Sequence, residues 1–258
     1  MADDMTQIDV KSRVGAEEWK VRVDLAAMYR LTALYGWDDL IFTHISHRVP
    51  GPEHHFLINP YGFLFEEITA SSLVKVDLDG NIVEETEYMI NPAGFTIHSA
   101  VHAAREDAHV VMHLHTNDGV AVSAQTDGLL PLSQTAMIAR HDLAYHDYEG
   151  IALDHGERER IVADIGEKNN LILRNHGTLT IGRTAADCFL RMFFLERACA
   201  MQIRALSAGV ENTITPSDEV QDVVKAQSNP QGMAVVSNRL AWPGLLRRLD
   251  RQNPGYDT

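Results

Sequence analysis

The chain has 258 residues, 45% of them hydrophobic, and a formal net charge of −14. This length and composition suit one large globular domain or two small ones, with a substantial core. The acidic balance argues against a nucleic acid or an anionic membrane as partner. We expect no transmembrane helix, since no run of about 18 apolar residues occurs.

The N-terminal residues lack the basic-then-apolar pattern of a secretory signal. The two cysteines, Cys188 and Cys199, are eleven positions apart on one predicted helix. That spacing separates them by about 16 Å, too far for a disulfide. We therefore expect a protein of the reducing cytoplasm.

Hydrophobic periodicity predicts mixed helices and strands along most of the chain. Gly36 is expected to end the first helix, and Asp79-Gly80 to form a hairpin turn. Thr116 and Thr184 are good N-caps for the helices that follow them. The predicted helices cover 17–35, 95–105, 117–125, 157–168 and 185–207, and the predicted strands cover 41–49, 55–59, 73–78, 81–83, 110–115, 143–146, 171–174 and 178–181.

The intermixed helices and strands favour one layered α/β domain with helices on both faces of a sheet. We assign residues 15–210 to this domain. Residues 1–14 are expected to form a flexible N-terminal arm. Residues 211–258 are expected to form a C-terminal arm that packs on a neighbouring subunit.

Two predicted strands end in histidines. His113 and His115 are two positions apart, so on a strand their side chains share one face. His176 follows another apolar strand and precedes Gly177. Three imidazoles with room for a water or a substrate are the ligand set of an open catalytic Zn²⁺ site. The alternative is that each histidine simply satisfies its hydrogen bonds at a strand end.

With these strands considered together, the chain resembles the class II aldolase/adducin family from about residue 19 to residue 209. The resemblance implies a three-layer α/β/α sandwich around a mostly antiparallel sheet. It also implies a homotetramer with active sites at subunit boundaries. The segments that carry it are GWDDLIFTHIS (36–46), NPYG (59–62), NPAGFTIH (91–98), HLHT (113–116) and RNHG (174–177).

In that family the matching histidines hold a divalent metal, so the resemblance makes His113, His115 and His176 the metal ligands. Zn²⁺ is the expected ion, with Mn²⁺, Fe²⁺ or Co²⁺ as alternatives. The acid/base glutamate of the sugar-phosphate aldolases is matched by Gly94. Their phosphate-binding serines are also replaced, and an early asparagine is matched by His44. These departures argue against a sugar phosphate as substrate.

Segments 36–41, 69–76, 91–100 and 144–151 are closer to the head domain of the adducins, which are cytoskeletal proteins. No long basic tail, of the kind with which adducins bind actin and the membrane skeleton, follows the domain here. We therefore expect a free-standing, adducin-like member of the family.

Several further residues are candidates for the site. His44 could contact the substrate or replace the missing acid/base group, or be a structural strand residue. Tyr145 and Tyr148 flank His146, and we select Tyr145 as a proton donor. Tyr256 could close over the site of a neighbouring subunit. Gly62 and Gly94 are expected to leave room for substrate, while His98 and His102 are expected to be structural.

The favoured function is a divalent-metal-dependent lyase. It would cleave an aldol or decarboxylate a small, non-phosphorylated, oxygenated substrate through a metal-stabilised enolate. The alternative is a catalytically silent, adducin-like binding protein with actin as its partner. An epimerase acting through the same enolate ranks third, because it too needs acid/base groups and the sequence does not identify them.

Overall fold

The computed structural model describes residues 10–150 and 156–258, without the side chains of residues 92–95. Seven strands form one sheet in the order β3-β2-β1-β4-β7-β6-β5. Among these described strands, β5 and β6 are parallel and every other neighbouring pair is antiparallel. The strands are β1 (His44–Arg48), β2 (Phe56–Ile58), β3 (Val74–Val76), β4 (Val110–Leu114), β5 (Leu143–His146), β6 (Asn170–Leu173) and β7 (Gly177–Gly182).

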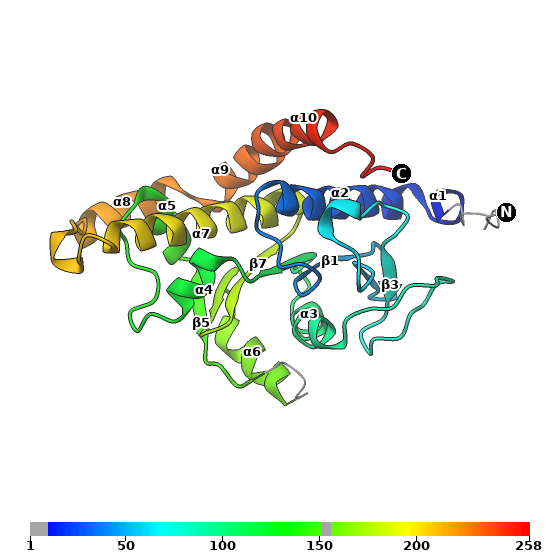
Figure 1. Ribbon diagram of the computed structural model, residues 1–258, viewed down its shortest axis with the longest axis horizontal. Helices are drawn as coiled ribbons and strands as arrows, with labels where there is room; N and C mark the ends of the chain where they lie inside the picture. Colours follow the sequence, from blue (N-terminus) through cyan, green and yellow to red (C-terminus); the bar gives the residue numbers. More distant parts are fainter. Residues whose placement is uncertain (1–9, 151–155) are drawn as a thin grey trace.

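Helices cover both faces of the sheet (Figure 1). The long helices α2 (Ala16–Leu34) and α7 (Ala185–Leu206) lie on one face, and α3 (Pro92–Ala104) and α6 (Glu157–Ile165) lie on the other. The remaining helical segments are α1 (Val10–Arg13), α4 (Asn117–Ser123), α5 (Gln134–Arg140), α8 (Asp218–Gln227), α9 (Pro230–Val235) and α10 (Trp242–Gln252), with the short 3₁₀-helices η1 (Phe65–Glu67) and η2 (Val210–Asn212) and the π-helix η3 (Val236–Ala241).

The central strand β4 shows how the sequence builds the two layers. Val110, Met112 and Leu114 are buried in the core that also contains α2 and α7. Val111 is buried in the core that contains α3 and α6. Because successive side chains of a strand point to opposite faces, His113 lies on the α3 side of the sheet. The predicted α/β/α sandwich around a mostly antiparallel sheet is confirmed.

Some predicted boundaries are wrong. The strand expected over 41–49 begins only at His44, because residues before it form turns with Leu40 at a φ of 51°. The strand expected over 81–83 is reduced to one bridge, between Val76 and Ile82. The Asp77 carboxylate accepts the backbone N–H groups of residues 79 and 81, which stabilises the turn between the two segments.

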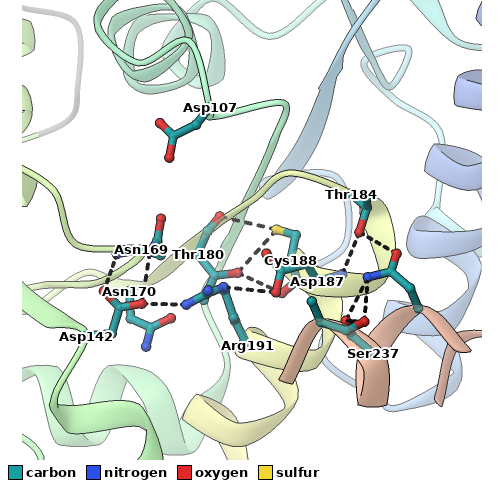
Figure 2. A network of polar contacts seen from close by, with 12 residues as sticks. Asp107, Asp142, Asn169, Asn170, Thr180, Thr184, Asp187, Cys188, Arg191 and Ser237 are labelled. Carbon is teal, nitrogen blue, oxygen red and sulfur yellow. Dashed lines mark hydrogen bonds and ion pairs between the residues drawn. The ribbon is translucent and has the colours of Figure 1, made fainter. Parts of the chain in front are cut away.

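A polar network ties α7 to the sheet (Figure 2). The Arg191 guanidinium donates to Asp142 at 2.5 Å and pairs with Asp187, one helical turn earlier, at 3.3 Å. Asp142 also accepts two hydrogen bonds from Asn169, at 3.1 Å from its backbone N–H and 2.9 Å from its side chain. Thr184 caps α7, as predicted, and donates to Asn238 of η3 at 2.9 Å.

The C-terminal segment is helical and packs on its own domain. Helix α10 lies on the outer side of α2 (Figure 1). Trp242, Leu249 and Tyr256 are buried in the core shared with α2. Contact of this arm with a neighbouring subunit stays a prediction. Residues 1–9 of the predicted N-terminal arm lie outside the described residues.

Candidate metal centre

Three histidines meet at one edge of the sheet. His113 belongs to β4, His115 follows its end, and His176 lies in the turn between β6 and β7. Their candidate ligand atoms all lie within 4.8 Å of one another. Antiparallel pairing of β4 with β7, in which Leu114 is opposite Thr178, brings the end of β4 beside the turn that carries His176.

The turn before β7 depends on two residues with unusual backbone requirements. Asn175 has a φ of 56°, a left-handed conformation that asparagine tolerates better than most residues. Gly177 lies so close to β4 that an added Cβ would be 2.3 Å from the carbonyl oxygen of Leu114. It would also be 3.2 Å from Cδ2 of His115. A glycine at this position therefore lets the strand ends, and the histidines on them, approach closely.

Outer partners fix the orientation of two of the rings. Nδ1 of His113 lies 3.0 Å from the carbonyl oxygen of Thr178 and donates to it. Nδ1 of His115 lies 3.1 Å from Oδ2 of Asp39. The two Nε2 atoms are left facing each other at 2.9 Å. This is the arrangement in which a carbonyl or carboxylate holds one ring nitrogen while the other ligates a metal.

The electrostatics also fit a metal. Burial lowers the pKa of His113 well below its usual range, and the neighbouring His176 and His115 rings lower it further. Burial, then the charge of His115, lowers the pKa of His176 to about 4. These imidazoles are therefore neutral near pH 7, with lone pairs available. A set of three histidine nitrogens suits Zn²⁺ or another divalent transition metal.

The three histidines open into a pocket of about 330 Å³. This volume is enough for a small substrate. Its walls combine apolar side chains with polar groups able to exchange protons or hydrogen bonds. Besides the three histidines, it is lined by Asp39, Phe42, His44, Asn91, Ile97, Tyr148 and Gly150.

His44 lies in this pocket, as the sequence predicted. It is opposite His113 in the pairing of β1 with β4, and the two ring centroids are 5.6 Å apart. Burial, and then the charges of His115 and His176, lower the pKa of His44 to about 3. His44 is therefore a neutral imidazole beside the three candidate ligands.

The tyrosine at the pocket is Tyr148 and not Tyr145. The Tyr148 ring centroid is 6.3 Å from that of His176. Tyr145 is paired with Ile172 across β5 and β6, and packs in the core that contains α5 and α7. Its hydroxyl accepts a hydrogen bond from the backbone N–H of Leu129 at 3.0 Å, so this hydroxyl stabilises the turn at Gly128.

The other predicted site residues lie elsewhere. Gly62 is in the turn after β2, with a φ of 100°, and is not among the described residues that line the pocket. Tyr256 donates to Asp250 at 3.0 Å within its own chain. Its proposed role over a neighbouring site stays a prediction. Gly94 belongs to the first turn of α3, and its surroundings lie outside what the structure describes.

The sequence reasoning missed Asp39, the carboxylate partner of His115. The two residues are 76 positions apart, and no spacing rule connects them. The only signal was a pair of acidic residues, Asp38 and Asp39, in a segment that follows the first helix. Phe42 and Asn91 were missed for the same reason, since turns and not strands carry them to the pocket.

The fold and site define an α/β/α protein with a candidate three-histidine metal centre at one sheet edge. A family model described as "Class II Aldolase and Adducin N-terminal domain" matches residues 23–203. The chain belongs to the class II aldolase and adducin family.

Bacterial relatives match over nearly the full length. A Caulobacter vibrioides protein, named only as a candidate class 2 aldolase, is 65% identical and aligns over 99% of both chains. A crystal structure of an aldolase II superfamily protein from Pseudomonas syringae is 52% identical, covers 96% of this chain and 99% of that one, and has a TM-score of 0.91.

Two other relatives have names that differ from each other. L-fuculose 1-phosphate aldolase from Glaciozyma antarctica is 26% identical, covers 92% of this chain and 93% of that one, and has a TM-score of 0.81. Mouse alpha-adducin is 44% identical over 92% of this chain, which spans only 34% of that protein. Within the described residues, no helix combines the length and apolarity needed to cross a membrane.

Proposed function

We propose that this protein is a divalent-metal-dependent carbon–carbon lyase for a small, non-phosphorylated, oxygenated substrate. The observation that supports the proposal is the convergence of three histidine side chains, two of them oriented by outer partners, on a pocket of substrate size. A metal bound there would supply Lewis-acid polarisation of a substrate carbonyl. Aldol cleavage and decarboxylation are the two reactions that we favour.

Residues of the protein would orient the ligands, bind the substrate and transfer protons. Asp39 and the carbonyl of Thr178 hold the His115 and His113 rings in place. His44 and Tyr148 line different parts of the same pocket and are the candidates for hydrogen bonding to the substrate and for proton transfer. They stand in for the aldolase glutamate, which is matched here by Gly94. Phe42 and Ile97 provide apolar parts of the wall.

The pocket wall supports a substrate without phosphate. No lysine or arginine occurs among the described residues that line it. Phosphate groups are often bound by such cations. A small hydroxy-keto acid, with one carboxylate and a carbonyl for the metal, fits this wall better than a sugar phosphate does.

We further propose Zn²⁺ as the resident metal, a cytoplasmic location and a homotetrameric assembly. Both cysteines are buried free thiols, which is compatible with a reducing compartment. The C-terminal arm exposes apolar side chains that a neighbouring subunit could cover, among them Ile214 (88% exposed) and Leu240 (65% exposed). Size-exclusion chromatography with light scattering tests the assembly.

The test is a turnover assay. The protein loaded with Zn²⁺, Mn²⁺ or Co²⁺ is incubated with a panel of hydroxy-keto acids, and products are followed by proton NMR. We expect cleavage or loss of CO₂ from at least one substrate, abolished in His113→Ala and retained in His109→Ala, which changes an exposed histidine just before the same strand. Equal turnover in both variants would contradict the role of the three-histidine centre.

A second candidate function is a catalytically silent, adducin-like binding protein. The high identity to mouse alpha-adducin favours it, and so does the absence of the family's acid/base glutamate. Co-sedimentation with filamentous actin is the discriminating measurement. Tight sedimentation together with no turnover on the panel would favour this alternative over the lyase.

A further inference from the structure

A chain of hydrogen bonds lies behind the pocket, on the α3 side of the sheet. It runs from His44 through His98 and Ser46 to His102, and ends at the backbone carbonyl of Ala108. The successive distances are 3.0 Å between His44 Nδ1 and His98 Nε2, 2.6 Å between His98 Nδ1 and Ser46 Oγ, 2.7 Å between Ser46 Oγ and His102 Nε2, and 2.9 Å between His102 Nδ1 and the Ala108 oxygen.

All four side chains in this chain are buried. His98 is 0% exposed and His44 is 4% exposed. Burial lowers the pKa of His98 well below its usual range and that of His102 to about 3. Phe56 stacks on the His102 ring at a centroid distance of 4.9 Å. Among the described residues, no carboxylate hydrogen-bonds to any of these three buried rings, so each ring is neutral and carries a single ring proton.

The carbonyl at the far end fixes the direction of every bond. A carbonyl can only accept, so Nδ1 of His102 carries the proton and its Nε2 is bare. Ser46 must then donate its one hydroxyl proton to that bare Nε2. Its oxygen is left as an acceptor, which requires a proton on Nδ1 of His98.

The bond between His98 and His44 is fixed in the same way. With its proton on Nδ1, His98 has a bare Nε2, and the adjacent Nδ1 of His44 must donate to it. His44 therefore donates its single ring proton to His98, on the side away from the pocket. Its Nε2 has no hydrogen-bond partner among the described residues, and His44 lines the pocket.

We infer that Ser46, His98 and His102 are positioning residues that hold His44 with a bare Nε2 toward the pocket, where it selects a substrate with a hydroxyl donor. A lone pair at that position attracts an O–H group and repels phosphate or carboxylate oxygens. This deepens the proposed function and rests on it for the substrate class. Nothing in the hydrogen-bond direction depends on catalysis.

Nuclear magnetic resonance of nitrogen-15-labelled histidines tests the direction of the chain. Long-range proton–nitrogen correlations report which ring nitrogen carries the proton, and His44→Asn assigns the His44 signals by their loss. We expect a protonated Nδ1 and a bare Nε2 on His44, with or without Zn²⁺. A proton on Nε2 of His44 in the unmodified protein would overturn the inference, whatever the outcome of the turnover assays.

Two variants separate positioning from general packing. Ser46→Ala removes the hydroxyl link, and we expect the His44 ring to show a mixture of tautomers. Ser99→Ala removes another buried hydroxyl, whose hydrogen bond within the described part of the chain is to the carbonyl of Thr96, one turn earlier on α3. This control should leave His44 unchanged. Similar disturbance by both variants would contradict the positioning role.

Hydroxyl selection is tested with two acids that differ by one hydroxyl. Glycolate and acetate are added separately to the Zn²⁺-loaded protein, and the Nε2 signal of His44 is followed. Glycolate should shift this signal and acetate should leave it in place. Equal shifts with both acids, or no shift with glycolate, would remove the selectivity claim.

Discussion

The carboxylate of Asp39 provides a quantitative test of how the candidate metal centre is organised. Its Oδ2 accepts from Nδ1 of His115 at 3.1 Å, so it fixes the ring with Nε2 toward the other histidines. Asp39→Asn keeps the shape of the side chain and removes its negative charge. The amide can turn either its oxygen or its nitrogen to the ring, so His115 loses one defined orientation.

The expected magnitude follows from comparable outer partners of metal-binding histidines. Loss of such a partner lowers metal affinity by about 10- to 100-fold, or roughly 1.4–2.7 kcal/mol. We expect Asp39→Asn to weaken Zn²⁺ binding by this factor in a competition titration with a chromogenic chelator. The unfolding free energy of the metal-free protein should change far less.

A matched control is available next to Asp39. Asp38 is exposed and does not line the pocket, so Asp38→Asn makes the same change of net charge without touching His115. It should leave Zn²⁺ affinity within about twofold of the unmodified protein. Unchanged affinity in Asp39→Asn, or equal losses in both variants, would refute the assignment of Asp39 as the partner that orients His115.

Two further predictions concern the strand ends and the buried core beside them. Gly177→Ala should lower both Zn²⁺ affinity and the unfolding free energy, the latter by about 1–3 kcal/mol, because its Cβ would meet the Leu114 carbonyl at 2.3 Å. Urea denaturation checks this against Gly232→Ala, where the nearest atom is 3.4 Å away; equal losses would contradict the argument. Burial raises the pKa of Glu196 from 4.5 to about 7, although Thr116 and Thr178 donate to it. Its contribution to stability is therefore fully present below pH 4.5 and is lost as the pH rises to 7. The unfolding free energy of Glu196→Gln, relative to that of the unmodified protein, should therefore rise by about 3 kcal/mol between pH 4.5 and 8. A pH-independent difference in urea titrations would show that Glu196 is not buried as a neutral acid.

The three candidate ligands could be predicted because their positions follow from local rules. A spacing of two residues on a strand places His113 and His115 on one face whatever the rest of the fold is. His176 follows an apolar strand that had to end at some sheet edge. The pairing of β4 with β7 brings that edge to the other two histidines, and the residue pattern did not predict this pairing.

The choice between the two tyrosines shows where the sequence was insufficient. Tyr145 and Tyr148 flank His146, and both were compatible with a site at the strand end. The structure separates them because β5 pairs with β6 so that Tyr145 is opposite Ile172, on the α5 and α7 side. Tyr148 lies past the end of β5, at the edge where His176 follows the parallel strand β6. That distinction requires the register of two strands far apart in sequence.

The helices of the C-terminal arm were harder still to predict from the sequence. Its helices α8 and α9 are only ten and six residues long, and isolated helices of this length are marginal in water. In the structure, α8 contacts α5 and α9 contacts η3, while α10 buries Trp242 and Leu249 beside α2. A sequence pattern without that partner surface indicates only an amphipathic segment.

The most direct test of the central claim is the metal content of the purified protein. Inductively coupled plasma mass spectrometry is applied to the unmodified protein, His113→Ala and the control His109→Ala, each after dialysis against Zn²⁺ and removal of the excess. We predict close to one metal per chain in the unmodified protein and in His109→Ala, and a loss of at least tenfold in His113→Ala. Equal metal in all three, or none in the unmodified protein, would contradict a three-histidine metal centre.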